Sequence, residues 1–124
     1  MKLQALVGGA AEVIGTEATL SQAADRMMDE DVDCLAVVEG RSVAGILTER
    51  DLVAALAADA DPAEQTVSAW MTDAPDTVPP NLTVREAATW LLETGYRHLP
   101  VMQGGELLGI VSITDVLWAL VETE

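Results

Sequence analysis

The 124-residue sequence is poor in aromatic and sulfhydryl side chains. It contains no phenylalanine, and three tryptophans and one tyrosine are its only aromatic residues, so its core must be mainly aliphatic. A single cysteine, Cys34, excludes an intrachain disulfide and requires no oxidising compartment. No apolar run approaches the roughly 18 residues of a membrane span. Gln4 interrupts the one N-terminal stretch that has the outline of a signal peptide. We therefore expect a cytoplasmic protein.

Basic residues are also scarce. Six lysines and arginines stand against 21 acidic residues, which gives a net charge of −15. This charge argues against nucleic acid as a partner, because such binding depends on Lys and Arg contacts to phosphates. An acidic surface either maintains solubility or reflects a salty or lysine-poor source. One histidine and one cysteine supply neither a catalytic triad nor a metal-ligand cluster, so we predict that the protein is not an enzyme.

What the sequence does contain is an internal repeat with an offset of 64 residues. "GILTERD" at 45–51 aligns with "GIVSITD" at 109–115, "TLSQAA" at 19–24 with "TVREAA" at 83–88, and "CLAVVEG" at 34–40 with "HLPVMQG" at 98–104. Of the 54 residue pairs in this gap-free alignment, 13 are identical. The sequence therefore predicts repeat 1 at 3–56, a linker at 57–66 and repeat 2 at 67–120.

Both repeats predict the same order of elements. Thr19 with Gln22, and Thr83 with Glu86, have the spacing of capping boxes, each followed by a helix. The apolar positions of these helices are 20, 23, 24, 27 and 28, and 84, 87, 88, 91 and 92. Each first helix is followed by a hairpin, with strands at 34–39 and 43–47 in repeat 1 and at 98–103 and 107–111 in repeat 2. A second helix then begins near residue 50 in repeat 1 and near residue 114 in repeat 2. With short extended pieces at 13–14 and 77–78, the expected fold class is α+β. Neither repeat is large enough alone, so we expect the two to pack sheet to sheet with pseudo-twofold symmetry.

The repeated phrase places a hydroxyl and an aspartate where a strand passes into a helix. Thr48-x-x-Asp51 and Ser112-x-x-Asp115 fit a simple helix cap. They also fit a ligand site, because one carboxylate can accept both hydroxyls of a ribose. The N–H groups at the same helix start favour a phosphate. Both interpretations stay open at this stage.

This layout, with G-x-x-[ST]-x-x-D closing the second strand twice and "YRHLPV" on one first strand, closely resembles a tandem pair of CBS domains, or Bateman module. The resemblance implies a small stand-alone regulatory protein without a covalent cofactor. It would bind an adenosine-containing ligand (AMP, ADP, ATP, S-adenosylmethionine or NAD), form a homodimer through its helices and modulate a separate effector protein. The alternative is an interaction module that dimerises without a ligand.

The resemblance also implies roles for individual residues. Ribose contacts fall on Thr48, Asp51, Ser112, Thr114 and Asp115; base contacts, largely through the backbone, on Val13, Ile14, Thr77, Val78 and Pro79; phosphate contacts on Arg50, Arg97 and His98. Repeat 1 has Asp33 and Cys34 where repeat 2 has Arg97 and His98, so we expect two unequal sites.

Some of these residues also have structural interpretations. Arg50 could form a surface ion pair with Glu49 or Asp51, His98 could be a structural side chain, and Cys34 is expected to be buried. Trp70, Trp90 and Trp118, with Leu91, Leu92 and Leu117, are candidates for an apolar helix face between subunits, core packing being the alternative.

Overall fold

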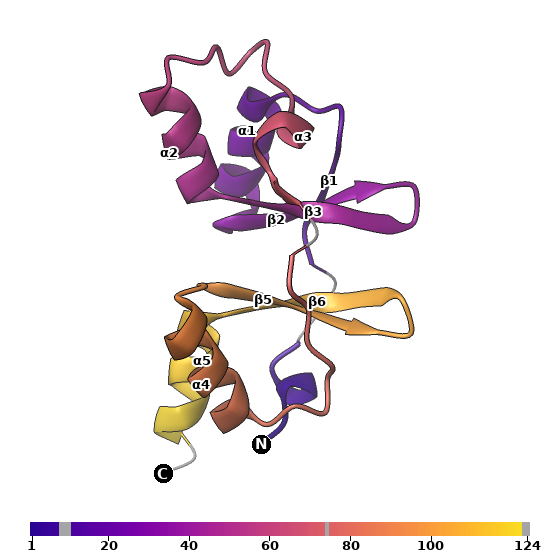
Figure 1. Ribbon diagram of the computed structural model, residues 1–124, viewed down its shortest axis with the longest axis vertical. Coiled ribbons are helices and arrows are strands. Elements are labelled where there is room, and N and C mark those ends of the chain that lie inside the picture. The colour runs from indigo at the N-terminus through magenta and orange to yellow at the C-terminus, as the bar shows by residue number, and fades with distance from the viewer. Residues whose placement is uncertain (8–10, 74, 123–124) are drawn as a thin grey trace. The chain divides into compact units, whose positions relative to one another are not determined.

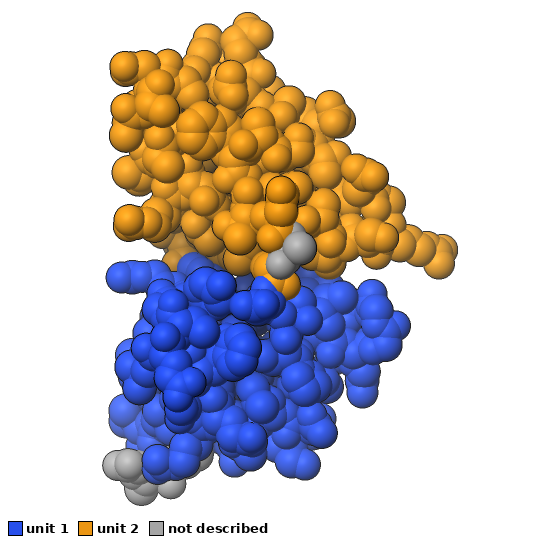
Figure 2. Space-filling model, in the orientation of Figure 1, with its two compact units in different colours: residues 1–11, 76–124 blue, residues 12–75 orange. Residues whose placement is uncertain are grey.

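The computed structural model describes residues 1–7, 11–73 and 75–122. The chain forms two compact units, which Figure 2 shows in different colours. Unit 2 comprises residues 12–75, and unit 1 comprises residues 1–11 together with 76–124. Each unit combines a small sheet with helices (Figure 1), which confirms the predicted α+β class.

Unit 2 contains a four-stranded sheet in the order β1-β2-β3-β4. β1 runs parallel to β2, whereas β2 with β3 and β3 with β4 are antiparallel. The elements are β1 Val13–Gly15, α1 Leu20–Glu30, β2 Cys34–Glu39, β3 Ser42–Thr48, α2 Glu49–Ala57, α3 Val67–Trp70 and β4 Thr72–Asp73. The predicted first helix, hairpin and second helix are therefore all present.

Unit 1 repeats this arrangement around an antiparallel hairpin. Its elements are η1 Leu3–Ala5, α4 Val84–Thr94, β5 His98–Gln103, β6 Glu106–Ser112 and α5 Ile113–Glu122. The extended piece predicted at 77–78 is reduced to one parallel bridge, between Val78 and Val101.

The two hairpins have the same register after a shift of 64 residues. Cys34 pairs with Thr48 in one, and His98 pairs with Ser112 in the other. Both hairpins also contain an irregularity at the same point, between 37 and 38 and between 101 and 102. The duplication seen in the sequence is therefore a duplication of local structure.

Both predicted capping boxes at the first helices are present. The backbone N–H of Gln22 donates to Thr19 Oγ1 over 3.2 Å, and the N–H of Thr19 donates to Gln22 Oε1 over 2.9 Å. In the second repeat, Thr83 and Glu86 exchange the same two bonds, each 3.1 Å long. These boxes satisfy N–H groups that a helix start otherwise leaves without intrahelical partners.

The opening segment of each sequence repeat lies in the unit built by the body of the other repeat. The N–H of Val67 donates to the carbonyl of Ala18 over 2.8 Å, inside unit 2. The N–H of Leu3 donates to the carbonyl of Leu82 over 2.8 Å, inside unit 1. Leu3 and Val67 are both fully buried. The compact units therefore divide the chain at different positions from the periods of the sequence.

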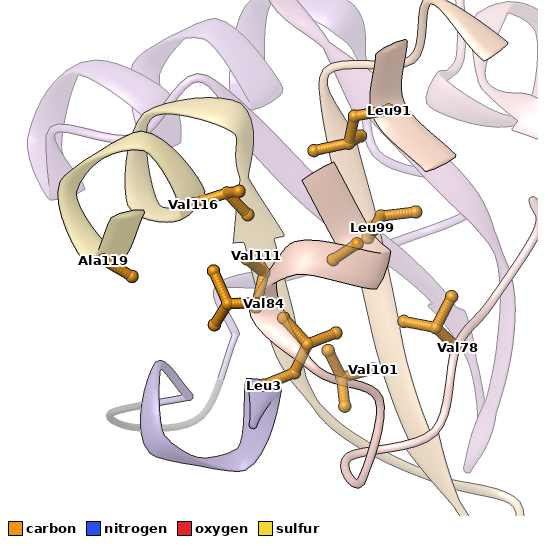
Figure 3. Packing of buried hydrophobic residues seen from close by; sticks show 10 residues of the cluster. Leu3, Val78, Val84, Leu91, Leu99, Val101, Val111, Val116 and Ala119 are labelled. Carbon is orange, nitrogen blue, oxygen red and sulfur yellow. The ribbon is translucent and has the colours of Figure 1, made fainter. Parts of the chain in front are cut away.

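Each unit has its own aliphatic core. Figure 3 shows that of unit 1, where Leu3 from η1, Val84 from α4 and Val101 from β5 come together. Ile14, Leu35 and Val67 belong to the core of unit 2. Among the described residues no aromatic side chain is fully buried, as the composition predicted.

The helix faces differ in part from the sequence interpretation. Met28 and Leu92, predicted on the apolar faces of the first helices, are exposed. Leu91 is buried in the core of unit 1, so it cannot form a surface between subunits. Trp70 packs against the core of unit 2, and its Nε1–H donates to Gln65 Oε1 over 3.0 Å. For Leu91 and Trp70 the core-packing alternative is correct.

Candidate ligand-binding site

The repeated phrase forms a strand-to-helix turn in each unit. In unit 2, β3 ends at Thr48 and α2 begins at Glu49; in unit 1, β6 ends at Ser112 and α5 begins at Ile113. Residues 33, 34 and 48–51 make up what we name corner 2, and residues 97, 98 and 112–115 make up corner 1. The sequence predicted these second helices to begin near Arg50 and Thr114, one residue later than they do.

The aspartates of both corners cap the helices that follow them. In corner 2, Asp51 Oδ2 accepts from the backbone N–H of Thr48 over 2.8 Å and from the Thr48 hydroxyl over 3.2 Å. In corner 1, Asp115 Oδ2 accepts from the N–H of Ser112 over 2.9 Å, and the N–H of Asp115 donates to Ser112 Oγ over 3.1 Å. The helix-cap interpretation is therefore correct, and it accounts for Oδ2 of each aspartate. Because these carboxylate bonds all end on Oδ2, Oδ1 of each aspartate lies outside the cap and can accept from a ligand.

The first strand of each hairpin brings a second pair of residues to the same turn. Cys34 pairs with Thr48, and the N–H of Glu49 donates to the carbonyl of Asp33 over 3.1 Å. In corner 1 the corresponding bond, 2.9 Å long, joins the N–H of Ile113 to the carbonyl of Arg97. The predicted phosphate residues Arg97 and His98 therefore lie at the corner that contains Ser112, Thr114 and Asp115.

The two corners carry different charge. Corner 2 contains Asp33, Glu49 and Asp51 with one base, Arg50; corner 1 contains Asp115 with one base, Arg97, and His98 beside them. Three acids and one base give −2, whereas one acid and one base give zero. A phosphate is therefore repelled less by corner 1 than by corner 2.

The pKa of the Cys34 thiol is raised by burial and by the carboxylates of corner 2. Cys34 is buried, as predicted. Burial raises its pKa from the ordinary 9.0 to about 12, and the carboxylates of Asp33 and then Asp51 act in the same direction. Both aspartates are therefore close enough to Cys34 to disfavour a further negative charge at this turn.

Arg50 is exposed on the first turn of α2. Within the part of the chain that the structure describes, it forms no ion pair with Glu49 or Asp51 at 4.0 Å or less. Arg26, by contrast, pairs with Glu12 at 3.5 Å. The ion-pair alternative for Arg50 is therefore absent here, and its guanidinium can turn toward an anion at corner 2.

The predicted base-contacting residues are divided between core and surface. Ile14 and Val78 are buried, whereas Val13, Thr77 and Pro79 are exposed. The N–H of Val78 donates to the carbonyl of Pro100, and the carbonyl of Val78 accepts from the N–H of Met102. Both hydrogen bonds are 3.0 Å long. Any backbone contact to a base at this segment therefore falls to its exposed neighbours, Thr77 and Pro79.

In unit 2 the segment at Val13 shares its sheet with the corner. β1 and β3 flank β2, with Val13 opposite Ala36 and Thr48 opposite Cys34. Two strand spacings amount to about 10 Å and two residues along a strand to about 7 Å. A nucleoside-sized ligand could therefore span from one to the other.

Sequence reasoning missed the function of the first glycine in the phrase. Gly45 pairs with Asp73 of β4, and a Cβ at this position would press against the backbone carbonyl oxygen of Thr72. Met71 Sδ would lie 3.0 Å from it. The glycine therefore allows β4 to approach β3, and only knowledge of β4 could have revealed this.

The described residues contain neither a metal-binding cluster nor a membrane-spanning helix. No group of three or more His, Cys, Asp or Glu side chains among residues 1–7, 11–73 and 75–122 is arranged to hold a metal ion. In the same residues, no helix is long and apolar enough to cross a membrane.

The fold and its two corners define a tandem α+β repeat protein, and comparison with known proteins identifies the family. The sequence matches the CBS domain at residues 11–58 and 67–122. The chain belongs to the CBS domain family, as a pair of these domains.

Individual relatives agree with this assignment. An uncharacterised 17.7 kDa protein of Acidianus ambivalens is 36% identical over 112 residues, which cover 89% of this chain and 67% of that protein. A CBS-domain protein of Burkholderia ambifaria has a TM-score of 0.94 at 25% identity and covers 100% of this chain and 96% of its own. The structure of CBSX2 in complex with AMP has a TM-score of 0.87 at 21% identity and covers 99% and 98%. The chain spans between 17% and 70% of the length of curated relatives that it matches.

Proposed function

We propose that this CBS-domain pair is a regulatory module that binds an adenosine-containing ligand and transmits its presence to a separate effector protein. The observation that carries the proposal is the duplicated corner, in which each cap leaves Oδ1 of its aspartate outside the box. The protein binds and does not catalyse, and it acts in the cytoplasm. The segments 3–56 and 67–120, with the linker 57–66, are the two halves of this module.

The ligand is oriented by the chemistry of the corners. Asp115 accepts the ribose hydroxyls at corner 1, with Ser112 and Thr114 beside it, and Asp51 with Thr48 does so at corner 2. The base lies toward Thr77, Val78 and Pro79 in unit 1, and toward Val13 and Ile14 in unit 2. Apolar side chains and backbone groups suit a flat ring with polar edges.

Phosphate binding favours corner 1. Arg97 and His98 stand beside the start of α5, where the helix N-terminus adds partial positive charge. Corner 2 offers only Arg50 against three carboxylates. We therefore assign nucleotide phosphates to corner 1 and a ligand with less negative charge to corner 2.

Two comparisons support an adenosine ligand and a signalling role. CBSX2, which shares the fold, was solved in complex with AMP. The Burkholderia relative is described as a candidate signal-transduction protein.

A binding experiment tests the proposal. AMP, ADP, ATP, S-adenosylmethionine, NAD and adenosine are added one at a time in a thermal-shift assay, with GMP as the control for the base. A ligand present at 100 times its dissociation constant stabilises the native state by about 2.7 kcal/mol, so the transition midpoint rises measurably. Isothermal titration calorimetry then gives the number of sites. Unchanged midpoints with every adenosine compound at millimolar concentration would reject the proposal.

A second candidate function is a ligand-free interaction module that forms a homodimer through its helices. The exposed apolar side chains of the second helices favour it. The two functions are compatible, because a ligand-sensing module can also be a dimer.

A further inference from the structure

The chain passes from unit 2 into unit 1 between Pro75 and Asp76. We name residues 71–73 and 75–79 the crossing segment. Its beginning contains β4 and belongs to unit 2, whereas its end, residues 77–79, belongs to unit 1 and is the segment proposed to contact the base there. The crossing segment therefore joins a sheet edge of one unit to a ligand-contacting segment of the other.

In unit 2 the crossing segment is attached to the strand that leads into corner 2. β4 pairs with β3 at Gly45 and Ile46, and β3 ends at Thr48, where α2 begins. β4 is an edge strand of two exposed residues, so its attachment depends on this pairing and on Met71, which packs against the core of unit 2. An element with so few buried contacts opens at a low cost in free energy. β4 therefore has two accessible states, paired with β3 and released.

In unit 1 the crossing segment is attached to the strand that begins at corner 1. The N–H of Val78 donates to the carbonyl of Pro100, and the N–H of Met102 donates to the carbonyl of Val78, both over 3.0 Å. The side chain of Val78 is buried in the core of unit 1. These partners lie on β5, which begins at His98. Both ends of the crossing segment are therefore attached to strands that carry a corner.

The connection between the two attachments is short. Four residues separate Asp73, the last residue of β4, from Val78. One of them is Pro75, whose ring fixes its φ angle. While β4 is paired, these residues are already restricted, so ordering Val78 in unit 1 costs less conformational entropy. Release of β4 in unit 2 restores that cost in unit 1.

We infer that the crossing segment transmits the state of β4 to the base-contacting residues of unit 1, and that Gly45 is the positioning residue that admits β4 to β3. A Cβ at Gly45 would press against the backbone carbonyl oxygen of Thr72, so a larger residue holds β4 away. A ligand that orders the end of β3 at corner 2 then raises the affinity of corner 1, and by linkage the reverse also holds. The effect on ligand affinity rests on the proposed function, whereas the connection between Gly45 and Val78 does not.

Hydrogen exchange followed by NMR tests the connection without any ligand. Gly45→Ala should speed exchange of the Val78 and Met102 amides about tenfold or more, although both amides belong to the other unit. Met27→Ala is the matched control, because it removes a core side chain of unit 2 on α1 and should leave both amides unchanged. Unchanged exchange in Gly45→Ala overturns the inference. Equal acceleration by Met27→Ala also overturns it, because loss of stability alone would then explain the effect.

An insertion of four glycines after Pro75 separates the crossing segment from any other route between the units. The glycines lengthen the connection and leave both attachments in place. In this background Gly45→Ala should no longer speed exchange of Val78, because the added residues take up the displacement of β4. Acceleration that persists in full with the insertion overturns the inference.

Calorimetric titration with AMP distinguishes failure of the inference from failure of the proposed function. An Asp51→Asn background removes the carboxylate of corner 2, so that AMP reports on corner 1. Gly45→Ala should weaken AMP about fivefold or more and Met27→Ala should not, and neither should matter with the four glycines in place. An unchanged AMP affinity in Gly45→Ala rejects the positioning role while the ligand site stands. Absence of AMP binding in every variant, with Val78 exchange accelerated as expected, rejects the ligand site while the connection stands.

Discussion

Asp115 accepts a hydrogen bond from the backbone N–H of Ser112 through Oδ2, over 2.9 Å. This bond shows that the aspartate of the repeated phrase stabilises the fold, whatever else it binds. A structural role and a ligand role can be separated only by variants that remove one and keep the other.

Asp115→Asn and Asp115→Ala achieve this separation. Alanine removes the bond that the carboxylate accepts from the N–H of Ser112, but keeps the backbone N–H that donates to Ser112 Oγ, so the free energy of unfolding should fall by about 1 kcal/mol. Asparagine retains an acceptor oxygen for the N–H of Ser112, so its stability should stay close to the wild type. It loses the charge and one acceptor, so AMP affinity should fall by roughly tenfold to a hundredfold. Urea unfolding and calorimetric titration measure the two effects.

Glu86→Gln is the control for this experiment. Glu86 occupies the corresponding place in the capping box of α4 but does not belong to a corner. Hydrogen bonds from the Thr83 backbone N–H and hydroxyl hold the pKa of Glu86 below its ordinary value of 4.5. AMP affinity should be unchanged in this variant. If Asp115→Asn also binds AMP as the wild type does, Asp115 is a cap alone.

A reciprocal exchange between the corners tests their inequality. Arg97→Asp with His98→Cys gives corner 1 the two hairpin-strand residues of corner 2, and Asp33→Arg with Cys34→His does the reverse. The first exchange should weaken AMP more than adenosine, because only AMP carries a phosphate; the second should strengthen AMP at corner 2. The ratio of the AMP and adenosine dissociation constants, measured by calorimetry, reports the effect. An unchanged ratio in both variants would show that these positions do not recognise phosphate.

The sequence predicted those parts of the fold that depend on neighbours along the chain. Thr19 and Gln22, three residues apart, predict their box because both partners belong to one helix start. Short apolar runs on either side of turn residues predicted both hairpins, the one at Cys34 and the one at His98. The width of a helix face was predicted less well: Met28 continues the apolar period but lies beyond the edge of the core.

Contacts between distant segments were not predictable in this way. Leu3 packs with Val84 and Val101, far along the chain, so no local pattern indicates that the opening segment belongs to unit 1. The two turns could be located in advance because the repeated phrase marks where a strand passes into a helix, whereas Arg97 and His98 were assigned to the site from the resemblance to the family. Which atoms they leave for a ligand, such as Oδ1 of Asp115, depends on cap geometry that the sequence does not specify.

Gly45 makes one of these contacts between distant segments, with β4, and substituting it tests how much the contact contributes to stability. Gly45→Ala places a methyl group against the backbone carbonyl of Thr72, which cannot move without displacing β4. Overpacking of this kind costs about 1–3 kcal/mol. Gly15→Ala is the matched control, because nothing lies within 4 Å of the new Cβ and its φ is not positive. Urea unfolding should show a clear loss for Gly45→Ala and no loss for Gly15→Ala. Equal effects would mean that chain entropy, and not the approach of β4, determines the result.

Cys34 should be inert in the native protein. Burial, with Asp33 and Asp51 nearby, raises the pKa of its thiol from 9.0 to about 12. Because the thiolate is the reactive form, alkylation by iodoacetamide at pH 8 should be at least about a hundredfold slower in the native chain than in urea. The raised pKa also makes stability depend on pH. The unfolded thiol loses its proton near pH 9 while the folded thiol keeps it, so its contribution is fully present below pH 9 and is lost as pH rises toward 12.

Comparing Cys34→Ala with the wild type separates the pH dependence due to the thiol from that due to lysine and tyrosine, which both proteins share. The variant should lose less stability than the wild type between pH 8 and pH 11, as measured by urea unfolding at each pH. Asp33→Asn should act in the same direction on the thiol, because removing a nearby carboxylate lowers its pKa and so speeds native alkylation at pH 9 to 10. Rapid alkylation of the native wild type at pH 8 would contradict both expectations, since it would require an accessible thiolate at corner 2. Slow alkylation that Asp33→Asn accelerates would show that the carboxylates of corner 2 act on a negative charge placed there. This is the property by which we propose that corner 2 selects a ligand with less negative charge than corner 1 does.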